Sequence, residues 1–432
     1  MSTLPKSLCR ILLAFCLAAP SPTAAEPLTL DRALRQVLEH HPRLRALEAE
    51  RHRLQGELAR TRQWLPDNPE LAGDWTSRDG PDDTTRDWEM SLSQRFEVAG
   101  QRGRRIDGAE QRLAALVQEL AALRVEVAAD VRQAYSGLAI AKAREQVAAE
   151  MVGLNDQLVK IARARFTAGD VSEADVALAA LALSEALRRQ LAEARESAAT
   201  RRELAVALGV DPLPPVAPIP LTSPPPPPPL AELQVQIEDH PRLAALGRAW
   251  QAAEADLALA RASRLPNVTV RAHAGEEESR DTLLGIGLSL PLPLFHRQQG
   301  EVGAARADRA RLAAEAVRVR ADLRHETERA RTALVAALEE LALFDSEILP
   351  GLDTHLRRIH RAYEIGEMDL TTLTVTQAQV VAARFDHLQV LLAAWQARID
   401  LDRALGRSTS RPEGASGNPP PAGRGPGGGR VE

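Results

Sequence analysis

One pattern of short motifs occurs twice in this chain, about 200 residues apart, and this repetition constrains the fold more than any single residue does. Four motif pairs keep the same order: 41–47 with 240–246, the Leu-Pro pairs 65–66 with 265–266, 166–170 with 363–367, and the Ala-Leu-Gly triplets 207–209 with 404–406. Because order and spacing are kept, we expect two halves of one internal fold, at 26–209 and 231–406.

The first 25 residues have the layout of a secretory signal peptide. Lys6 and Arg10 precede an apolar run at 11–19, and small residues at 23–25 offer a cleavage site. The run is shorter than the roughly 20 residues of a membrane-spanning helix. Both cysteines, Cys9 and Cys16, lie in this segment, so the mature chain is expected to have no disulfide or thiolate ligand. Neither cysteine follows a small residue, which disfavours lipidation.

Composition narrows the classes of partner. The chain carries 54 basic and 59 acidic side chains that are interspersed along its length, which disfavours nucleic-acid binding. Only 3% of its residues are aromatic, and a compact core of this size would normally hold more. We therefore expect an elongated, mainly helical molecule built on small-residue seams.

Two segments show the period of two that is typical of strands with one apolar face. They are predicted to form strand hairpins at 70–98 and 267–293, with turns at 79–83 and 275–280. The positions predicted to face lipid are Trp75, Trp88, Met90, Leu92, Phe96, Leu284, Ile286, Leu288 and Leu290.

The two hairpins comprise four strands, and each strand is long enough to cross a bilayer at a tilt. Four strands cannot close a barrel alone, and open edges in lipid would leave backbone groups unpaired at several kcal/mol each. Closure would need other copies of the chain. The alternative is a small sheet packed on helices in a soluble domain.

The rest of the chain has helical periodicity. A helix is expected at 32–62, capped by Thr29 or Asp31, and coiled-coil hairpins are expected at 101–209 and 297–406. The first helix of the 101–209 hairpin could extend about 100 Å at about 1.5 Å per residue. Pro350 and Gly351 should kink the second hairpin. A Pro-rich linker at 210–230 should form an extended external strap, and 407–432 should be disordered.

No constellation for catalysis, for a cofactor or for a resident metal is evident. The 10 histidines are scattered, and His355 and His360 have a poor spacing for one helical face. Glycine-rich phosphate loops and nucleophile elbows are missing from the sequence. The basic run at 100–105 is interpreted as a strand-to-helix junction near lipid headgroups. We therefore expect no enzymatic activity.

The candidate functional residues lie at the turns of the two helix hairpins. In the first, Ser172 and Asp175 form the spacing of a capping box, and in the second Asp369 is placed as an N-cap. The other acids have no such role, and a ring of acids would attract cations. The predicted tip residues are Phe166, Gly169, Asp170, Ser172, Asp175, Tyr363, Gly366, Glu367 and Asp369.

The doubled plan, the stretch 92–105 and the motifs Phe166-x-x-Gly169-x-x-Ser172-x-x-Asp175 and Tyr363-x-x-Gly366 resemble the TolC family of outer-membrane efflux proteins. The resemblance covers the mature chain up to Gly406 and is nearest to members of cobalt, zinc and cadmium resistance systems. It implies a homotrimer with a twelve-stranded barrel in the outer membrane and a helical tunnel in the periplasm.

The resemblance also implies partners. A periplasmic adaptor would dock at the tip, and an inner-membrane RND pump would supply energy, so the chain would conduct its substrate passively. Relatives carry a basic and acidic lock after the second-turn glycine, and a basic lock partner is not evident in the matching stretch here. The alternatives are a periplasmic coiled-coil adaptor or scaffold, and a channel of this fold for drugs or other organic solutes.

Overall fold

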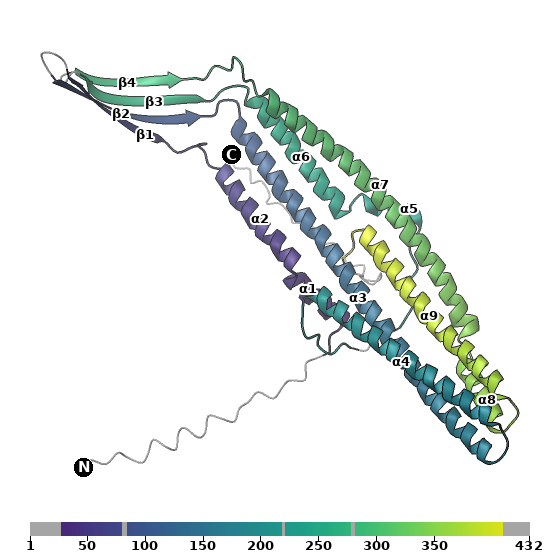
Figure 1. Cartoon of the computed structure of the whole chain (residues 1–432). Helices are drawn as coiled ribbons and strands as arrows, with labels where there is room; N and C mark the ends of the chain where they lie inside the picture. Colours follow the sequence, from purple (N-terminus) through teal and green to yellow (C-terminus); the bar gives the residue numbers. More distant parts are fainter. Residues whose placement is uncertain (1–26, 80–83, 218–220, 278–280, 409–432) are drawn as a thin grey trace, which may run out of the picture.

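The computed structural model describes residues 27–79, 84–217, 221–277 and 281–408, and these form an elongated molecule with a sheet at one end and helix turns at the other (Figure 1). The predicted signal peptide, the tips of both strand hairpins and nearly all of the C-terminal tail lie outside these residues. The helices are α1 (Leu30–His40), α2 (Pro42–Thr61), α3 (Gln101–Thr167), α4 (Glu173–Leu208), α5 (Leu230–Ile237), α6 (Pro241–Ala262), α7 (Gln299–Leu343), α8 (Leu352–Glu364) and α9 (Leu370–Ala404). The strands are β1 (Glu70–Asp79), β2 (Thr84–Phe96), β3 (Val268–Glu277) and β4 (Asp281–Ser289).

The two strand hairpins join into one antiparallel sheet in the order β1-β2-β3-β4. Trp75 is paired with Trp88, and Leu92 is paired with Leu71 on one side and Ala272 on the other. Since paired residues project from the same face, this register gathers the predicted apolar side chains of the strands on one face. In the described sheet β1 and β4 each pair with a single strand, so the sheet has two open edges.

Three details differ from the sequence expectation. Strand β3 continues to Glu277 through residues predicted as loop, because Gly275 and Glu276 remain paired with β2. Leu290 lies one residue beyond the end of β4. Phe96 is half-buried, whereas the other predicted lipid-facing side chains are exposed.

The helices supply no single central core. Helix α3 runs for 67 residues and contacts α4, α6 and α9. Buried residues form separate clusters along its length, such as one around Leu120 and Val131 and another around Leu158 near the helix turns. Among the described residues, no helix combines the length and the apolar character needed to span a membrane.

The helix predicted at 32–62 is two helices that break at His41. Proline disfavours helical backbone in the residue before it, and His41 is extended before Pro42. The His41 imidazole accepts a hydrogen bond from the Arg43 amide at 3.3 Å and so caps α2. His240 begins α6 in the same way. The repeated His-Pro motif is therefore a helix start, and α1 is capped by Thr29.

The kink predicted at Pro350 and Gly351 is confirmed. A π-helical turn at Phe344–Ile348 follows α7, and Gly351, with φ +92°, precedes α8.

The described part of the Pro-rich linker at 210–230 runs along the helices. It pairs with the N-terminal segment through Leu28 and Val216, and the Trp395 indole donates a hydrogen bond to the Thr222 carbonyl at 2.9 Å.

Candidate functional site

The end of the molecule opposite the sheet consists of two helix turns with the same backbone design. At the first, Gly169 has φ +82°, and the Asp170 amide donates to the Arg165 carbonyl at 2.9 Å. At the second, Gly366 has φ +81°, and the Glu367 amide donates to the Ala362 carbonyl at 2.9 Å. These are glycine C-caps, in which a left-handed residue lets the chain satisfy the last carbonyls of the helix.

The return helices begin with capping carboxylates, as predicted. The Asp175 carboxylate accepts hydrogen bonds from the Ser172 amide at 2.9 Å and the Ser172 hydroxyl at 2.7 Å. Asp369 accepts from the Thr372 amide at 2.9 Å and the Thr372 hydroxyl at 2.6 Å. These hydrogen bonds, first those from the Ser172 and Thr372 side chains, hold the pKa of Asp175 and of Asp369 below the usual aspartate value.

One arginine joins the two turns. Arg165, in the last turn of α3, donates from Nη1 to the Tyr363 carbonyl at 2.9 Å and places its guanidinium 5.0 Å from the centre of the Tyr363 ring. The stretch after Gly366 holds no basic side chain, as the sequence indicates, and the basic partner of the second turn is Arg165 instead. Sequence comparison within the second turn missed it because Arg165 comes from the other half of the chain. A basic residue in the last turn of a helix was the available signal.

The two aromatic residues that the repeat aligns have opposite environments. Tyr363 is 1% exposed and packs with α3 and α9 residues such as Leu158 and Leu373, whereas Phe166 is 47% exposed. The buried Tyr363 hydroxyl has no hydrogen-bond partner among the described residues. Tyr363 is thus an anchor between hairpins, and Phe166 is available for contact outside the chain.

A cleft of about 460 Å³ separates the two turns. It is lined by every predicted tip residue except Phe166, together with the missed Arg165. The lining residues are Arg165, Gly169, Asp170, Val171, Ser172, Asp175, Tyr363, Gly366, Glu367, Met368, Asp369 and Leu370.

The acids of this cleft fall into two kinds. Asp175 and Asp369 are committed to capping, whereas Asp170 and Glu367 are exposed, and no ion pair of either is formed within the described part of the chain. No cluster of three or more histidine, cysteine or acidic residues suited to a metal ion occurs among the described residues. The cleft can therefore attract cations through its free carboxylates.

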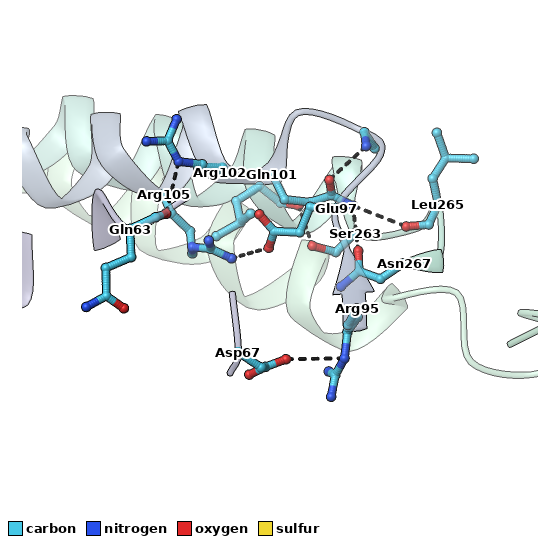
Figure 2. Close-up of polar contacts among 12 residues, drawn as sticks. Gln63, Asp67, Arg95, Glu97, Gln101, Arg102, Arg105, Ser263, Leu265 and Asn267 are labelled. Atoms are coloured by element: carbon cyan, nitrogen blue, oxygen red, sulfur yellow. Dashed lines mark hydrogen bonds and ion pairs between the residues drawn. The ribbon is translucent and has the colours of Figure 1, made fainter. Parts of the chain in front are cut away.

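A second polar site lies where the sheet meets the helices (Figure 2). Gln101, the first residue of α3, accepts a hydrogen bond from the Ala99 amide at 2.8 Å. Its amide donates to the Leu265 carbonyl at 3.3 Å and to the Asn267 side chain at 3.2 Å, which belong to the other half. This side chain is 3% exposed. Gln101 thus clamps the two halves together.

The neighbouring arginines hold the same junction. Arg102 donates to the Arg62 carbonyl at 2.7 Å and to the Gln63 carbonyl at 3.1 Å, at the end of α2. Arg105 forms a close ion pair with Glu97 (Figure 2). The basic run predicted to lie near lipid headgroups therefore turns these two guanidinium groups toward the protein: Arg102 meets carbonyls that the end of α2 leaves without partners, and Arg105 meets the Glu97 carboxylate.

Comparison with known proteins places this architecture. A family model described as outer membrane efflux protein matches residues 33–210 and 233–407, and these segments fall on the two halves of the chain. The chain is 27% identical over 389 residues to the cobalt-zinc-cadmium resistance protein CzcC of Cupriavidus metallidurans, covering 89% of this chain and 91% of that protein.

Two further similarities support the comparison. The nickel-cobalt-cadmium resistance protein NccC of Alcaligenes xylosoxydans is 25% identical over 314 residues, which cover 70% of this chain and 71% of that protein. The solved structure of CusC, reported with its transmembrane channel formation, matches with a TM-score of 0.73 at 18% identity, covering 88% of this chain and 92% of that one. The fold is thus that of these channels.

Proposed function

Since the chain belongs to the outer membrane efflux protein family, we propose that it is the outer-membrane channel of a three-part efflux system and conducts heavy-metal cations passively out of the cell. Family membership rules against the alternative of a periplasmic adaptor or scaffold. An inner-membrane RND pump supplies the energy and a periplasmic adaptor connects it to this chain. The chain itself performs no catalysis and needs no cofactor.

The observation that carries the substrate proposal is the similarity to CzcC along nearly the whole of both chains. The name of that relative refers to cobalt, zinc and cadmium, and the name of NccC refers to nickel, cobalt and cadmium. The free carboxylates of Asp170 and Glu367 suit a path for cations. Selection among metals would reside mainly in the pump.

The sheet supports a barrel formed by three copies. Each copy supplies four strands and leaves two edges open, and unpaired backbone groups in lipid are costly. The apolar face, with Met90, Leu92 and Ile286 exposed in the single chain, would contact lipid. The paired Trp75 and Trp88 would mark the membrane interface, where aromatic rings concentrate.

The helix turns support a gate at the periplasmic end. Arg165 and Tyr363 hold the two hairpins of one copy together, and the adaptor would dock beside Gly169 and Gly366. The exposed Phe166 offers an apolar contact on that surface. Opening would require the hairpins to separate at this cleft.

The test is a deletion strain challenged in parallel with zinc, cobalt, cadmium and a panel of dyes and drugs. We expect loss of metal tolerance with unchanged tolerance of organic compounds, and recovery on expression of the intact chain. Unchanged metal tolerance with lost dye or drug tolerance would favour the other candidate, an organic-solute channel of the same fold. Membrane fractionation and unheated gel electrophoresis test the trimer: a soluble monomer would overturn the barrel.

A further inference from the structure

The chain has two equivalent junctions between strand and helix. Gln101 begins α3 and accepts the Ala99 amide at 2.8 Å, and Gln299 begins α7 and accepts the Arg297 amide at 2.8 Å. Both are preceded by a residue with positive φ. The segments 91–101 and 289–299 align without a gap, through the shared Ser-Leu at 91–92 and 289–290. The two glutamines therefore occupy the same place in the repeated fold.

Their surroundings differ in one respect. The Gln101 amide crosses to the other half of the chain, at Leu265 and Asn267, and is buried there. The Gln299 amide donates to the Phe295 carbonyl of its own segment at 3.2 Å, and the side chain is exposed. The described chain places no segment of the other half against Gln299. The Gln299 junction therefore keeps the contacts within its own segment but lacks, in the described chain, the contact with the other half that Gln101 makes.

A segment equivalent to the one that Gln101 binds lies at the opposite edge of the sheet, before β1. The Leu-Pro motif and asparagine that Gln101 binds at 265–267 correspond to Leu65, Pro66 and Asn68, just before β1. Exposed apolar side chains accompany both edges: Trp64 is 75% exposed before β1, and Phe295 is 84% exposed after β4. Such side chains on two complementary edges indicate an interface with a second copy.

We infer that Gln299 clamps the Leu65-Pro66 turn of a second copy as Gln101 clamps the Leu265-Pro266 turn of its own chain. This inference rests on the proposed homotrimer and assigns the residues that close it. The inference applies only to the junction between strand and helix. Further along α3, away from the sheet, Gly108 lies against Ala255 and Asp256 of α6. The counterpart of Gly108 in α7 is Arg306, so α7 cannot approach a helix of the second copy as closely as α3 approaches α6.

The pairing of β2 with β3 predicts which residues of β4 and of the next copy's β1 would lie opposite each other. Gln94 and Val270 are partners across β2 and β3. Their counterparts are Leu292, through the gapless alignment, and Gly73, because Gly73 pairs with Met90 as Val270 pairs with Leu288, the counterpart of Met90. Both residues are exposed in the single chain. Leu292 of one copy should therefore lie opposite Gly73 of the next.

Disulfide cross-linking tests this register, because the only cysteines of the sequence lie at positions 9 and 16. The full chain with Gly73→Cys and Leu292→Cys, oxidised in outer-membrane fractions, should give covalent dimers and trimers on a non-reducing gel. The matched control pairs Leu292→Cys with Ser77→Cys, on the same face but displaced along β1 by about 13 Å. Cross-linking of the control pair in place of the Gly73 pair would overturn the register.

Substitution of Gln299 tests the clamp separately. Gln299→Glu keeps an oxygen that can accept the Arg297 amide but replaces the amide donor with a carboxylate facing carbonyl oxygens. We expect the trimer to dissociate on heating at a lower temperature than wild type, as with Gln299→Leu. Asp308→Asn, on the exposed surface of α7, should leave the dissociation temperature unchanged.

These outcomes distinguish the proposed trimer from the Gln299 clamp. A wild-type chain that is a monomer in detergent overturns the proposed trimer and this inference together. A wild-type trimer whose dissociation temperature is unchanged by Gln299→Glu overturns the clamp and leaves the channel standing. If the cysteine variants fail to reach the membrane, the Gln299 variants still decide.

Discussion

Arg165 donates a hydrogen bond to the Tyr363 carbonyl at 2.9 Å while its guanidinium lies 5.0 Å from the centre of the Tyr363 ring. The two residues are 198 positions apart and belong to different hairpins. A planar cation can make both contacts at once, and an ammonium group cannot do so equally well. One side chain therefore ties the two hairpin tips of a copy together, in addition to the apolar packing around Tyr363.

Arg165→Ala should loosen the tip. It removes a charge-assisted hydrogen bond that contributes about 1.5 kcal/mol and a cation–π contact of about 0.5 kcal/mol at a partly exposed site. We expect a larger single-channel conductance in planar bilayers and an intermediate value for Arg165→Lys.

Arg163→Ala is the matched control, since Arg163 is exposed on the same helix. Tyr363→Phe should also leave conductance nearly unchanged, because the hydroxyl it removes is unpaired among the described residues. Equal conductance of Arg165→Ala and wild type would show that the contact does not limit opening.

Replacing both Asp170 and Glu367 by their amides should lower cation selectivity. These carboxylates are exposed in the tip cleft and do not cap helices. The measurement is the reversal potential across a salt gradient, with Glu173→Gln as a control near the same turn. If the reversal potential is unchanged by the double variant, the tip acids do not select ions.

Gly406→Ala should destabilise the protein more than Gly209→Ala. The two glycines end the same motif with φ of +71° and +66°, so the backbone cost of about 1 kcal/mol is shared. A Cβ on Gly406 would lie 2.6 Å from Cδ of Pro241, whereas nothing lies within 4 Å at Gly209. We expect about 1–3 kcal/mol of additional destabilisation, measured by urea unfolding. Equal losses would contradict the crowding argument.

Stability should fall on acidification through His240. Its Nδ1 accepts the Arg242 amide at 3.1 Å, and its Nε2 lies 3.3 Å from the Arg403 carbonyl. This pair of contacts needs the neutral imidazole with the proton on Nε2. Burial, aided by Arg242 and opposed by Glu126 and the Arg403 bond, lowers the pKa of His240.

The direction of this pH effect follows from the linkage between proton binding and folding. Because the folded pKa is lowered, the unfolded state binds the proton more readily below about pH 6.5, so stability is lost as the pH falls from there toward the folded pKa. Thermal unfolding of wild type and His240→Asn between pH 7 and pH 5 checks this. Asparagine can cap α6 without titrating, so its profile should be flatter. Parallel profiles would exclude His240 as the titrating group.

Periodicity was enough to predict the sheet and the long helices, because one apolar face per strand and a seam per helix are local properties of the sequence. Trp88 and Met90 alternate with the polar residues Asp87, Glu89 and Ser91 whatever they pack against. The break at His41 was missed because the apolar pattern continues through it. A proline after a histidine carried the signal, which is a constraint on backbone and not on hydrophobicity.

Long-range partners could not be predicted in this way. The sequence indicates that Arg165 ends a helix and that Gln101 begins one, but not that each reaches the other half of the chain. Nor does the alignment of Phe166 with Tyr363 show that one is exposed and the other buried. These assignments depend on which helices become neighbours, and that is set by the packing of the whole bundle.

By itself the sequence determined the doubled plan, the strand faces, and the helix caps at Ser172 and Asp369. Each follows from the preferences of a residue and its near neighbours. Only the tertiary structure decided that Arg165 joins the tips and that Gln101 joins the halves, while Gln299 has no such partner among the described residues. Those contacts join residues more than 160 positions apart, and no local pattern encodes which distant carbonyl a side chain will meet.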